Sequence, residues 1–80
     1  MSYVYILKCA DGTYYAGSTT DLSRRLREHN TSKNGAHYTK IRRPVVLVYQ
    51  EEFATLAEAR KREAELKRLT RIQKEALCKE

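Results

Sequence analysis

The stretch SYVYILKCADGTYYAGS, residues 2–18, decides the fold. It holds four of the six tyrosines of the chain, and its two ends, residues 3–9 and 13–18, are rich in β-branched and aromatic residues. Such runs favour strands, and the Asp11-Gly12 pair between them is typical of a tight turn. The stretch therefore predicts a β-hairpin that concentrates the aromatic side chains of the protein.

Two loops suit this turn, and they differ in the faces on which the tyrosines lie. A loop of two residues places Tyr5 and Tyr15 on opposite faces of the hairpin. A loop of three residues, 10–12, with its glycine in the left-handed conformation, pairs Cys9 with Thr13 and makes the two tyrosines diagonal neighbours on one face. Taken singly, each tyrosine is best explained as strand packing, because aromatic residues favour strands.

Hydrophobic periodicity and capping residues predict the remaining elements. In chain order these are a helix from about 22 to about 32, a strand over 44–53, a helix from 56 to about 69 and a short terminal helix after Thr70. Capping boxes at 55–58 and 70–73 mark the starts of the last two helices. The order β-β-α-β-α-α predicts an α+β, sandwich-like fold in which a three-stranded, mainly antiparallel sheet packs against helices. We expect residues 1–80 to form a single domain, with the valine-rich third strand central in the sheet.

The chain is strongly basic, with a formal net charge of +6 and an isoelectric point near 9.6. The excess lies between residues 22 and 43, where seven arginines and lysines face Glu28 alone. This imbalance favours an anionic partner, most simply nucleic acid, over a basic protein with no anionic target. The two cysteines make neither a disulfide framework nor a metal motif. Because the sequence shows no signal peptide and no long apolar run, we expect a cytoplasmic protein with no membrane partner.

Two polar residues lie on the apolar side of the first predicted helix. Residues three or four apart share a helix face, so Arg25 and His29 lie beside Leu22 and Leu26. Either Arg25 extends past the leucines to solvent while His29 caps the helix end, or the two residues have a functional role.

The second predicted helix carries a carboxylate in its apolar stripe. Its inward positions are Leu56, Ala59, Glu63, Leu66 and Thr70. A carboxylate that is buried, charged and unpaired is strongly unfavourable, so Glu63 needs a partner. That partner is an arginine, a hydroxyl or a divalent cation, and the structural alternative is a buried ion pair, for instance with Arg25.

Together, these residues resemble the GIY-YIG nuclease family, in particular its small stand-alone, single-domain bacterial members. Residues 3–5, Tyr-Val-Tyr, match the first motif with a tyrosine in place of its glycine, and residues 15–17, Tyr-Ala-Gly, match the second. The family pattern has an arginine ten residues after the second tyrosine and a histidine or tyrosine four residues later. These positions are Arg25 and His29 in this chain.

The glutamate helix extends the resemblance toward the end of the chain. The segment AEARKREAELK is similar to the family segment that carries the metal-binding glutamate, which is Glu63 here. Many family nucleases also have an asparagine after this helix. Residues 64–80 contain none, and Lys67 and Lys74 are the polar candidates near that place.

The resemblance implies a cleft in which the site side chains converge. The catalytic residues that it implies are Tyr5, Tyr15, Arg25, His29 and Glu63. Convergence requires both motif tyrosines on one face, which favours the three-residue loop. Gly17 then pairs near Tyr5, where a side chain would crowd the tyrosine or an approaching phosphate. In the same register Tyr14 faces away as a packing residue, and Tyr3 supports the strand end.

The resemblance also implies a metal-dependent hydrolase. One divalent ion, Mg²⁺ or Mn²⁺, is held by Glu63 and the phosphate, and it stabilises the developing charge and the leaving oxygen. Arg25 holds the phosphate through its planar guanidinium. Two residues are candidates for the base that activates water. The family implies Tyr5, whose ordinary pKa of about 10 must be lowered by the metal and Arg25, whereas His29 titrates nearer neutrality.

The predicted partner is nucleic acid, with DNA favoured over RNA. In this interpretation a basic loop follows the phosphate backbone, and Tyr38 stacks on a splayed base rather than packing on the sheet edge. The predicted nucleic-acid-binding residues are Tyr38, Lys40, Arg42, Arg43 and Lys67. We expect little base-sequence specificity unless a protein partner supplies it, and DNA repair is the expected setting. Two other functions compete: a nucleic-acid-binding module with a decayed site, and an adaptor that presents the hairpin to another protein.

Overall fold

The described residues form a three-stranded antiparallel sheet in the computed structural model, which covers residues 1–31, 39 and 41–78. Strand β1 (Ser2–Cys9) lies in the centre, between β2 (Tyr14–Thr19) and β3 (Val45–Phe53). The prediction of an α+β fold with the order β-β-α-β-α-α is confirmed.

The expectation that the third strand is central was wrong, because β1 is the strand that is buried on both of its faces. Four consecutive residues of β1 are at most 2% exposed: Val4, Tyr5, Ile6 and Leu7. Strand β3 leaves Val46 55% exposed and continues into Glu51 and Glu52. A strand with such polar and exposed positions is suited to a sheet edge.

The hairpin turn is the three-residue loop. The Cys9 amide donates a hydrogen bond of 2.8 Å to the Thr13 carbonyl, and Gly12 adopts a positive φ of 84°. A glycine takes this left-handed conformation without steric cost. The resulting register places Tyr5 and Tyr15 on the same face of the sheet.

Helices follow in the predicted order, as α1 (Leu22–Thr31), α3 (Leu56–Lys67) and α4 (Arg71–Cys78). Each begins at a capping side chain, and for the last two helices this is the capping box that the sequence predicts. Asp21 Oδ1 accepts a hydrogen bond of 3.1 Å from the Arg24 amide at the start of α1. At the start of α4, Thr70 and Gln73 exchange hydrogen bonds of 2.9 and 3.2 Å between their side chains and amides. Within the described part of the chain, no helix has the length and apolar character needed to cross a membrane.

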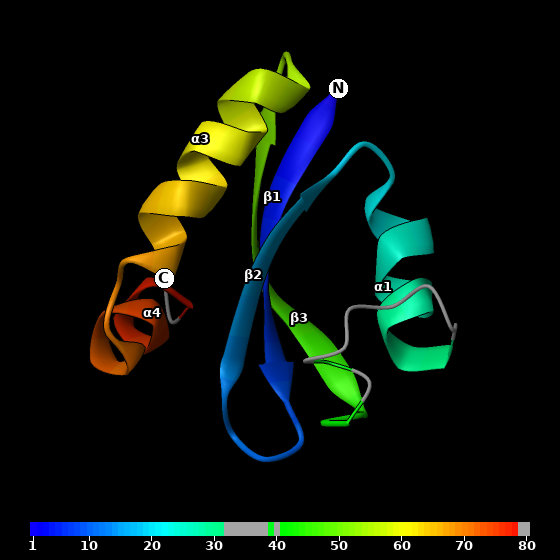
Figure 1. Cartoon of the computed structure of the whole chain (residues 1–80), viewed down its shortest axis with the longest axis vertical. Helices are drawn as coiled ribbons and strands as arrows, with labels where there is room; N and C mark the ends of the chain where they lie inside the picture. Colours follow the sequence, from blue (N-terminus) through cyan, green and yellow to red (C-terminus); the bar gives the residue numbers. More distant parts are fainter. Residues whose placement is uncertain (32–38, 40, 79–80) are drawn as a thin grey trace.

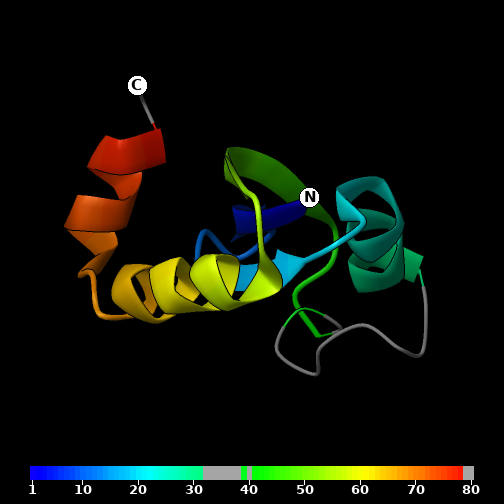
Figure 2. The same ribbon diagram turned by 90° about the horizontal axis from the view of Figure 1, so that it is seen from above.

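Each face of the sheet has its own apolar cluster, and different helices cover the two faces (Figures 1 and 2). One cluster joins Val4, Ile6 and Ala16 to Leu66 of α3, with half-buried residues of α4 packed beside them. The other cluster joins β1 and β3 to Leu22 and Leu26 of α1, and it contains both Tyr5 and Tyr15. In Figure 1, α3 and α1 lie on opposite sides of the sheet, with the strands between them, and β2 is an edge strand.

Candidate active site

A buried hydrogen-bonded row joins β1, α1 and Thr39. Tyr5 Oη lies 2.8 Å from His29 Nε2, and His29 Nδ1 lies 2.7 Å from Thr39 Oγ1. His29 and Thr39 are fully buried, and Tyr5 is 2% exposed. The ring of Tyr15 stands edge-on to His29, with 5.2 Å between ring centroids. His29 is therefore the link between two buried hydroxyl groups.

Burial sets the protonation states in this row. It is the main cause that raises the pKa of Tyr5 from 10.0 to about 12, although a hydrogen bond to the Arg25 guanidinium opposes the rise. Burial, assisted by the positive charges of Arg25 and Arg43, lowers the pKa of His29 from 6.5 to about 4. At neutral pH the row consequently consists of a phenol, a neutral imidazole and a hydroxyl.

The row requires a close approach of β2 to Tyr5. Gly17 pairs directly with Tyr5 across the hairpin. A Cβ atom added at Gly17 would lie 2.6 Å from Tyr5 Cζ and closer still to Tyr5 Oη. The expected crowding at this glycine is thus a direct consequence of the register, since only a residue without a side chain leaves the phenol in place.

Arg25 lies beside the phenol and is partly open to solvent. Its Nη1 lies 3.1 Å from Glu28 Oε1, and its side chain is 26% exposed. The guanidinium also lowers the pKa of Tyr5, although burial of the phenol has the larger, opposite effect. Glu28 thus orients a cation that faces both Tyr5 and solvent.

Glu63 lies on the other face of the sheet, against β2. Ser18 Oγ donates a hydrogen bond of 2.6 Å to Glu63 Oε1, and Lys67 Nζ lies 2.7 Å from Glu63 Oε2. Burial opposes ionisation of this carboxyl, but the hydrogen bonds from Lys67 and Ser18 outweigh burial and hold its pKa below the ordinary value. The carboxylate in the apolar stripe is therefore ionised, and its partners are a hydroxyl and a lysine.

The two groups of side chains act on each other across the edge of β2. Besides burial, which is the main cause, the Glu63 carboxylate also raises the pKa of Tyr5. The pKa of Lys67 is raised chiefly by its hydrogen bond to Glu63 and in a smaller measure by Tyr15. Tyr5, Tyr15, Arg25 and His29, here called one wall of the candidate site, thus lie on one face of the sheet, and Glu63, the other wall, lies on the opposite face, with the edge strand between them.

The predicted nucleic-acid-binding arginines make contacts within the protein. Arg42 Nε lies 3.0 Å from Asp11 Oδ2 in the hairpin loop. The Arg43 guanidinium donates hydrogen bonds to the main-chain carbonyls of Glu28 and His29, near the end of α1. These contacts fasten the segment before β3 to the hairpin and to α1. Tyr38 and Lys40 lie outside the described residues.

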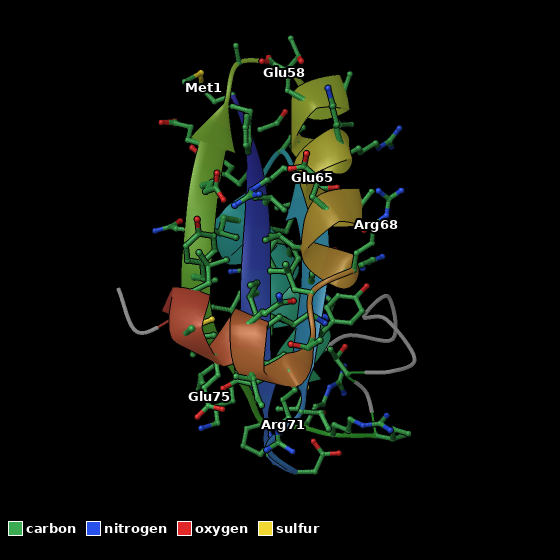
Figure 3. All side chains as sticks on the ribbon, turned by 90° about the vertical axis from the view of Figure 1, so that its left-hand side faces the viewer. Met1, Glu58, Glu65, Arg68, Arg71 and Glu75 are labelled. Atoms are coloured by element: carbon green, nitrogen blue, oxygen red, sulfur yellow. The ribbon has the colours of Figure 1, made fainter. Side chains whose placement is uncertain are left out.

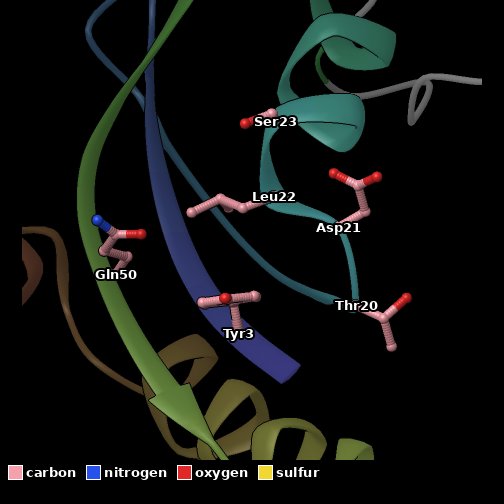
Figure 4. A pocket seen from close by; sticks show the side chains of 6 residues that line it. All are labelled: Tyr3, Thr20, Asp21, Leu22, Ser23 and Gln50. Carbon is pink, nitrogen blue, oxygen red and sulfur yellow. The ribbon is translucent and has the colours of Figure 1, made fainter. Parts of the chain in front are cut away.

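A hollow of about 360 Å³ opens between the start of α1 and strands β1 and β3 (Figure 4). Its lining residues are Tyr3, Thr20, Asp21, Leu22, Ser23 and Gln50. Tyr3, which replaces the glycine of the first motif, faces this hollow. None of the five predicted catalytic residues lines it, so this hollow is separate from the walls on either side of β2.

Residues 1–76 match the sequence family described as the GIY-YIG catalytic domain. The chain therefore belongs to the GIY-YIG family, which is a family of nucleases.

Several relatives are similar to this chain over nearly its whole length. The UPF0213 protein VNG_2274C of Halobacterium salinarum is 52% identical over 77 residues, which cover 96% of this chain and 99% of the relative. The UPF0213 protein SERP0126 of Staphylococcus epidermidis is 54% identical over 78 residues, which cover 98% of this chain and 94% of the relative. The solution structure of protein EF2693 from E. faecalis is 51% identical, with a TM-score of 0.65 over 99% of this chain and 84% of that one.

Three residues that touch the site, Glu28, Ser18 and Thr39, were not identified from the sequence. Ser18 follows Gly17 and therefore faces the side of the sheet opposite to Tyr5, where α3 lies. The hairpin register was sufficient to place Ser18 there, but only the packing of α3 brings Glu63 to it. Thr39 lies in a segment without hydrophobic periodicity, so no sequence pattern predicted its contact with His29.

Proposed function

We propose that the protein is a divalent-metal-dependent nuclease that hydrolyses phosphodiester bonds in DNA with little base-sequence specificity of its own. The observation that carries the proposal is the pair of walls at the β2 edge. One wall contains a buried phenol, a buried imidazole and a partly exposed guanidinium, and the other contains an ionised carboxylate. We take residues 1–80 as one GIY-YIG-like domain that acts in the cytoplasm, with specificity supplied by substrate shape or by a protein partner.

Arg25 is proposed to hold the scissile phosphate. Its side chain is partly exposed, and its planar group suits two oxygens of a phosphate. Its ion pair with Glu28 keeps it oriented toward Tyr5 before substrate arrives. Such preorientation is what electrostatic stabilisation of a transition state requires.

Tyr5 is proposed to orient and deprotonate the attacking water, with His29 as its proton acceptor. Tyr5 Oη and His29 Nε2 are within hydrogen-bond distance, at 2.8 Å. When Tyr5 takes a proton from water, its own phenolic proton passes to His29 Nε2, so Tyr5 does not need to exist as a free phenolate. Thr39 is a positioning residue in this scheme, because its hydroxyl fixes the orientation of the imidazole from Nδ1.

Glu63 is the residue that would hold the metal. The carboxylate is ionised and one of its oxygens is fixed by Ser18, which suits a hard cation that keeps most of its waters. Lys67 is the competing cation, and its side chain is 52% exposed, so it has room to move away. A divalent ion bound at Glu63 would stabilise the negative charge on the phosphate and on the leaving oxygen.

The ion pair of Lys67 with Glu63 favours one alternative function, a nucleic-acid-binding module that does not cleave. The Lys67 ammonium group lies 2.7 Å from Glu63, at the oxygen that a metal would use, and the described residues contain no cluster of three or more metal-ligating side chains. In the alternative, the protein binds nucleic acid through this permanent positive charge and does not cleave it. Metal dependence separates the two functions.

The test is cleavage of labelled single-stranded, duplex and branched DNA, and of the matching RNA, with Mg²⁺ or Mn²⁺. We expect cleavage by the wild type and at least a 10²-fold lower rate for Glu63→Gln, which keeps the size of the side chain but removes its charge. Glu52→Gln is the matched control, because Glu52 is exposed on β3 and lies outside both walls. If the wild type binds DNA in a salt-sensitive way but no metal supports cleavage, the binding module replaces the nuclease.

A further inference from the structure

A second polar hollow lies on the opposite face of the sheet from Tyr5. It has a volume of about 190 Å³ and is lined by Thr13 and Tyr14 at the start of β2 and by Arg71 and Lys74 of α4. Figure 3 shows Arg71 below α4, beside the hairpin. The lining thus combines two cations, two hydroxyl groups and an aromatic ring, and it contains no carboxylate.

The two cations of this hollow are not held in ion pairs by the described residues, in contrast to several arginines of residues 22–43. Arg71 and Lys74 make no ion pair and no side-chain hydrogen bond with any other residue in the described ranges 1–31, 39 and 41–78. By contrast, Arg24 and Arg25 share Glu28, and Arg42 is paired with Asp11. A cation without a carboxylate partner keeps its full attraction for an external anion.

Neighbouring charges strengthen the positive character of the hollow. Lys8 pairs with Tyr14 across the hairpin, so its exposed side chain leaves the same face of the sheet. Lys8 also has no ion-pair partner among the residues that the structure describes. The nearest acidic residue along α4 is Glu75, which has an interaction of its own. Asp11, which contacts Thr13 of the hollow, is paired with Arg42, so Lys8, Arg71 and Lys74 outnumber Glu75 and leave this end of the sheet positive.

The position of the hollow relative to Glu63 follows from β2. Tyr14 and Ser18 lie on the same face of this strand, four residues apart, and Ser18 is the hydroxyl that contacts Glu63. At about 3.3 Å per residue, Tyr14 of the hollow lies about 13 Å along the strand from Ser18, which contacts the Glu63 carboxylate. Lys67, which pairs with Glu63, lies at the end of α3. Lys67, Arg71 and Lys74 thus follow Glu63 along the chain, and the last two line the hollow.

We propose that the hollow between β2 and α4 binds a backbone phosphate of the nucleic-acid strand whose scissile phosphate lies at Glu63. The inference rests on the proposed nucleic-acid substrate, and it adds a second contact that fixes the direction in which the strand runs. Arg71 and Lys74 neutralise the phosphate, and the hydroxyl group of Tyr14 donates a hydrogen bond to one of its oxygens, whereas the Thr13 hydroxyl already donates to Asp11 Oδ1 at 2.6 Å.

The test is the salt dependence of DNA binding by the double variant R71A/K74A, measured without added metal. A protein that neutralises Z phosphates shows a slope of about −0.9Z in a plot of log K against log salt concentration for duplex DNA. Removing two phosphate-facing cations should make the slope less negative by about 1.8. The matched control is R27A/K61A, which removes the same charge from exposed positions on α1 and α3 and should keep the wild-type slope.

The possible salt-dependence results test whether the hollow binds a phosphate. An unchanged slope in R71A/K74A, or an equal change in both double variants, would overturn the role of the hollow. The charge-preserving variant R71K/K74R should restore the wild-type slope, and melting temperatures equal to that of the wild type show that all variants are folded. Because this readout contains no cleavage step, failure of the nuclease activity is detected separately, by the metal-dependent cleavage assay.

Discussion

Replacing Gly17 by alanine tests how closely β2 must approach the phenol of Tyr5. The added Cβ would lie 2.6 Å from Tyr5 Cζ, whereas ordinary contacts begin near 3.4 Å, so the ring has to retreat by about 0.8 Å. Tyr5 is 2% exposed and is hydrogen-bonded to His29, so no free space is open to the ring. Gly17→Ala must therefore lower the stability of the fold, distort the Tyr5–His29 hydrogen bond, or do both.

The expected losses of stability and of rate follow from the displacement of the Tyr5 ring by about 0.8 Å. Overpacking a filled core costs about 1–3 kcal/mol. For a domain of this size, each kcal/mol lowers the melting temperature by roughly 4–8 °C. A shift of about 1 Å in a reacting group lowers the rate by about 10²-fold. We expect Gly17→Ala to lose stability on this scale and to lose about two orders of magnitude in kcat per folded molecule.

The matched control is Gly12→Ala, which adds the same methyl group elsewhere in the hairpin. Gly12 has φ 84°, so alanine is strained there, but its Cβ would meet Arg71 Nη2 at an ordinary 3.4 Å. Both variants should melt at lower temperature, and only Gly17→Ala should lose kcat when the rate is corrected for the folded fraction. A Gly17→Ala protein with wild-type melting temperature and wild-type cleavage would refute the close approach, and equal kcat losses in the two variants would refute its link to Tyr5.

The remaining predictions concern the buried row. Because the pKa of His29 is about 4 in the folded protein and 6.5 when unperturbed, the unfolded chain binds more protons between these values, and the free energy of unfolding should fall as the pH is lowered from 6.5 to 4. At about 1.36 kcal/mol per pH unit the loss approaches about 3 kcal/mol, and urea unfolding of His29→Gln should lack this part of the pH dependence. Thr39→Val leaves His29 Nδ1 without its hydroxyl partner and should cost about 1–3 kcal/mol. The same variant should lower kcat more than it changes KM, whereas Thr39→Ser should restore both; wild-type kinetics and stability in Thr39→Val would contradict the positioning role.

Local sequence was sufficient to predict the elements and several of their ends. The Thr70-to-Gln73 capping box forms as expected, because its two hydrogen bonds join residues only three apart. The residues alone left two hairpin loops open. The three-residue loop was favoured only because the family resemblance required Tyr5 and Tyr15 on one face, and the register of the sheet agrees.

The need of Glu63 for a partner was also readable from the sequence, since a carboxylate in an apolar stripe is unfavourable when it is unpaired. Its actual partners, Ser18 and Lys67, were not predicted as such. Ser18 lies 45 residues before Glu63 in the chain, and the two meet only because α3 packs across β2.

Charge counting pointed to the segment 22–43 as the nucleic-acid footprint, yet Arg42 and Arg43 hold the hairpin and α1 in place. The cations without ion-pair partners in the described part of the chain include Arg71 and Lys74, which are distant from that segment in the sequence but lie beside the hairpin loop that Arg42 contacts. The sequence alone therefore determined the strands, the helices and the residue types of the candidate site, because backbone preferences and face alternation act over a few residues. Only the tertiary structure decided which strand is central and which cation meets which carboxylate, because these depend on packing between segments that are distant in the chain.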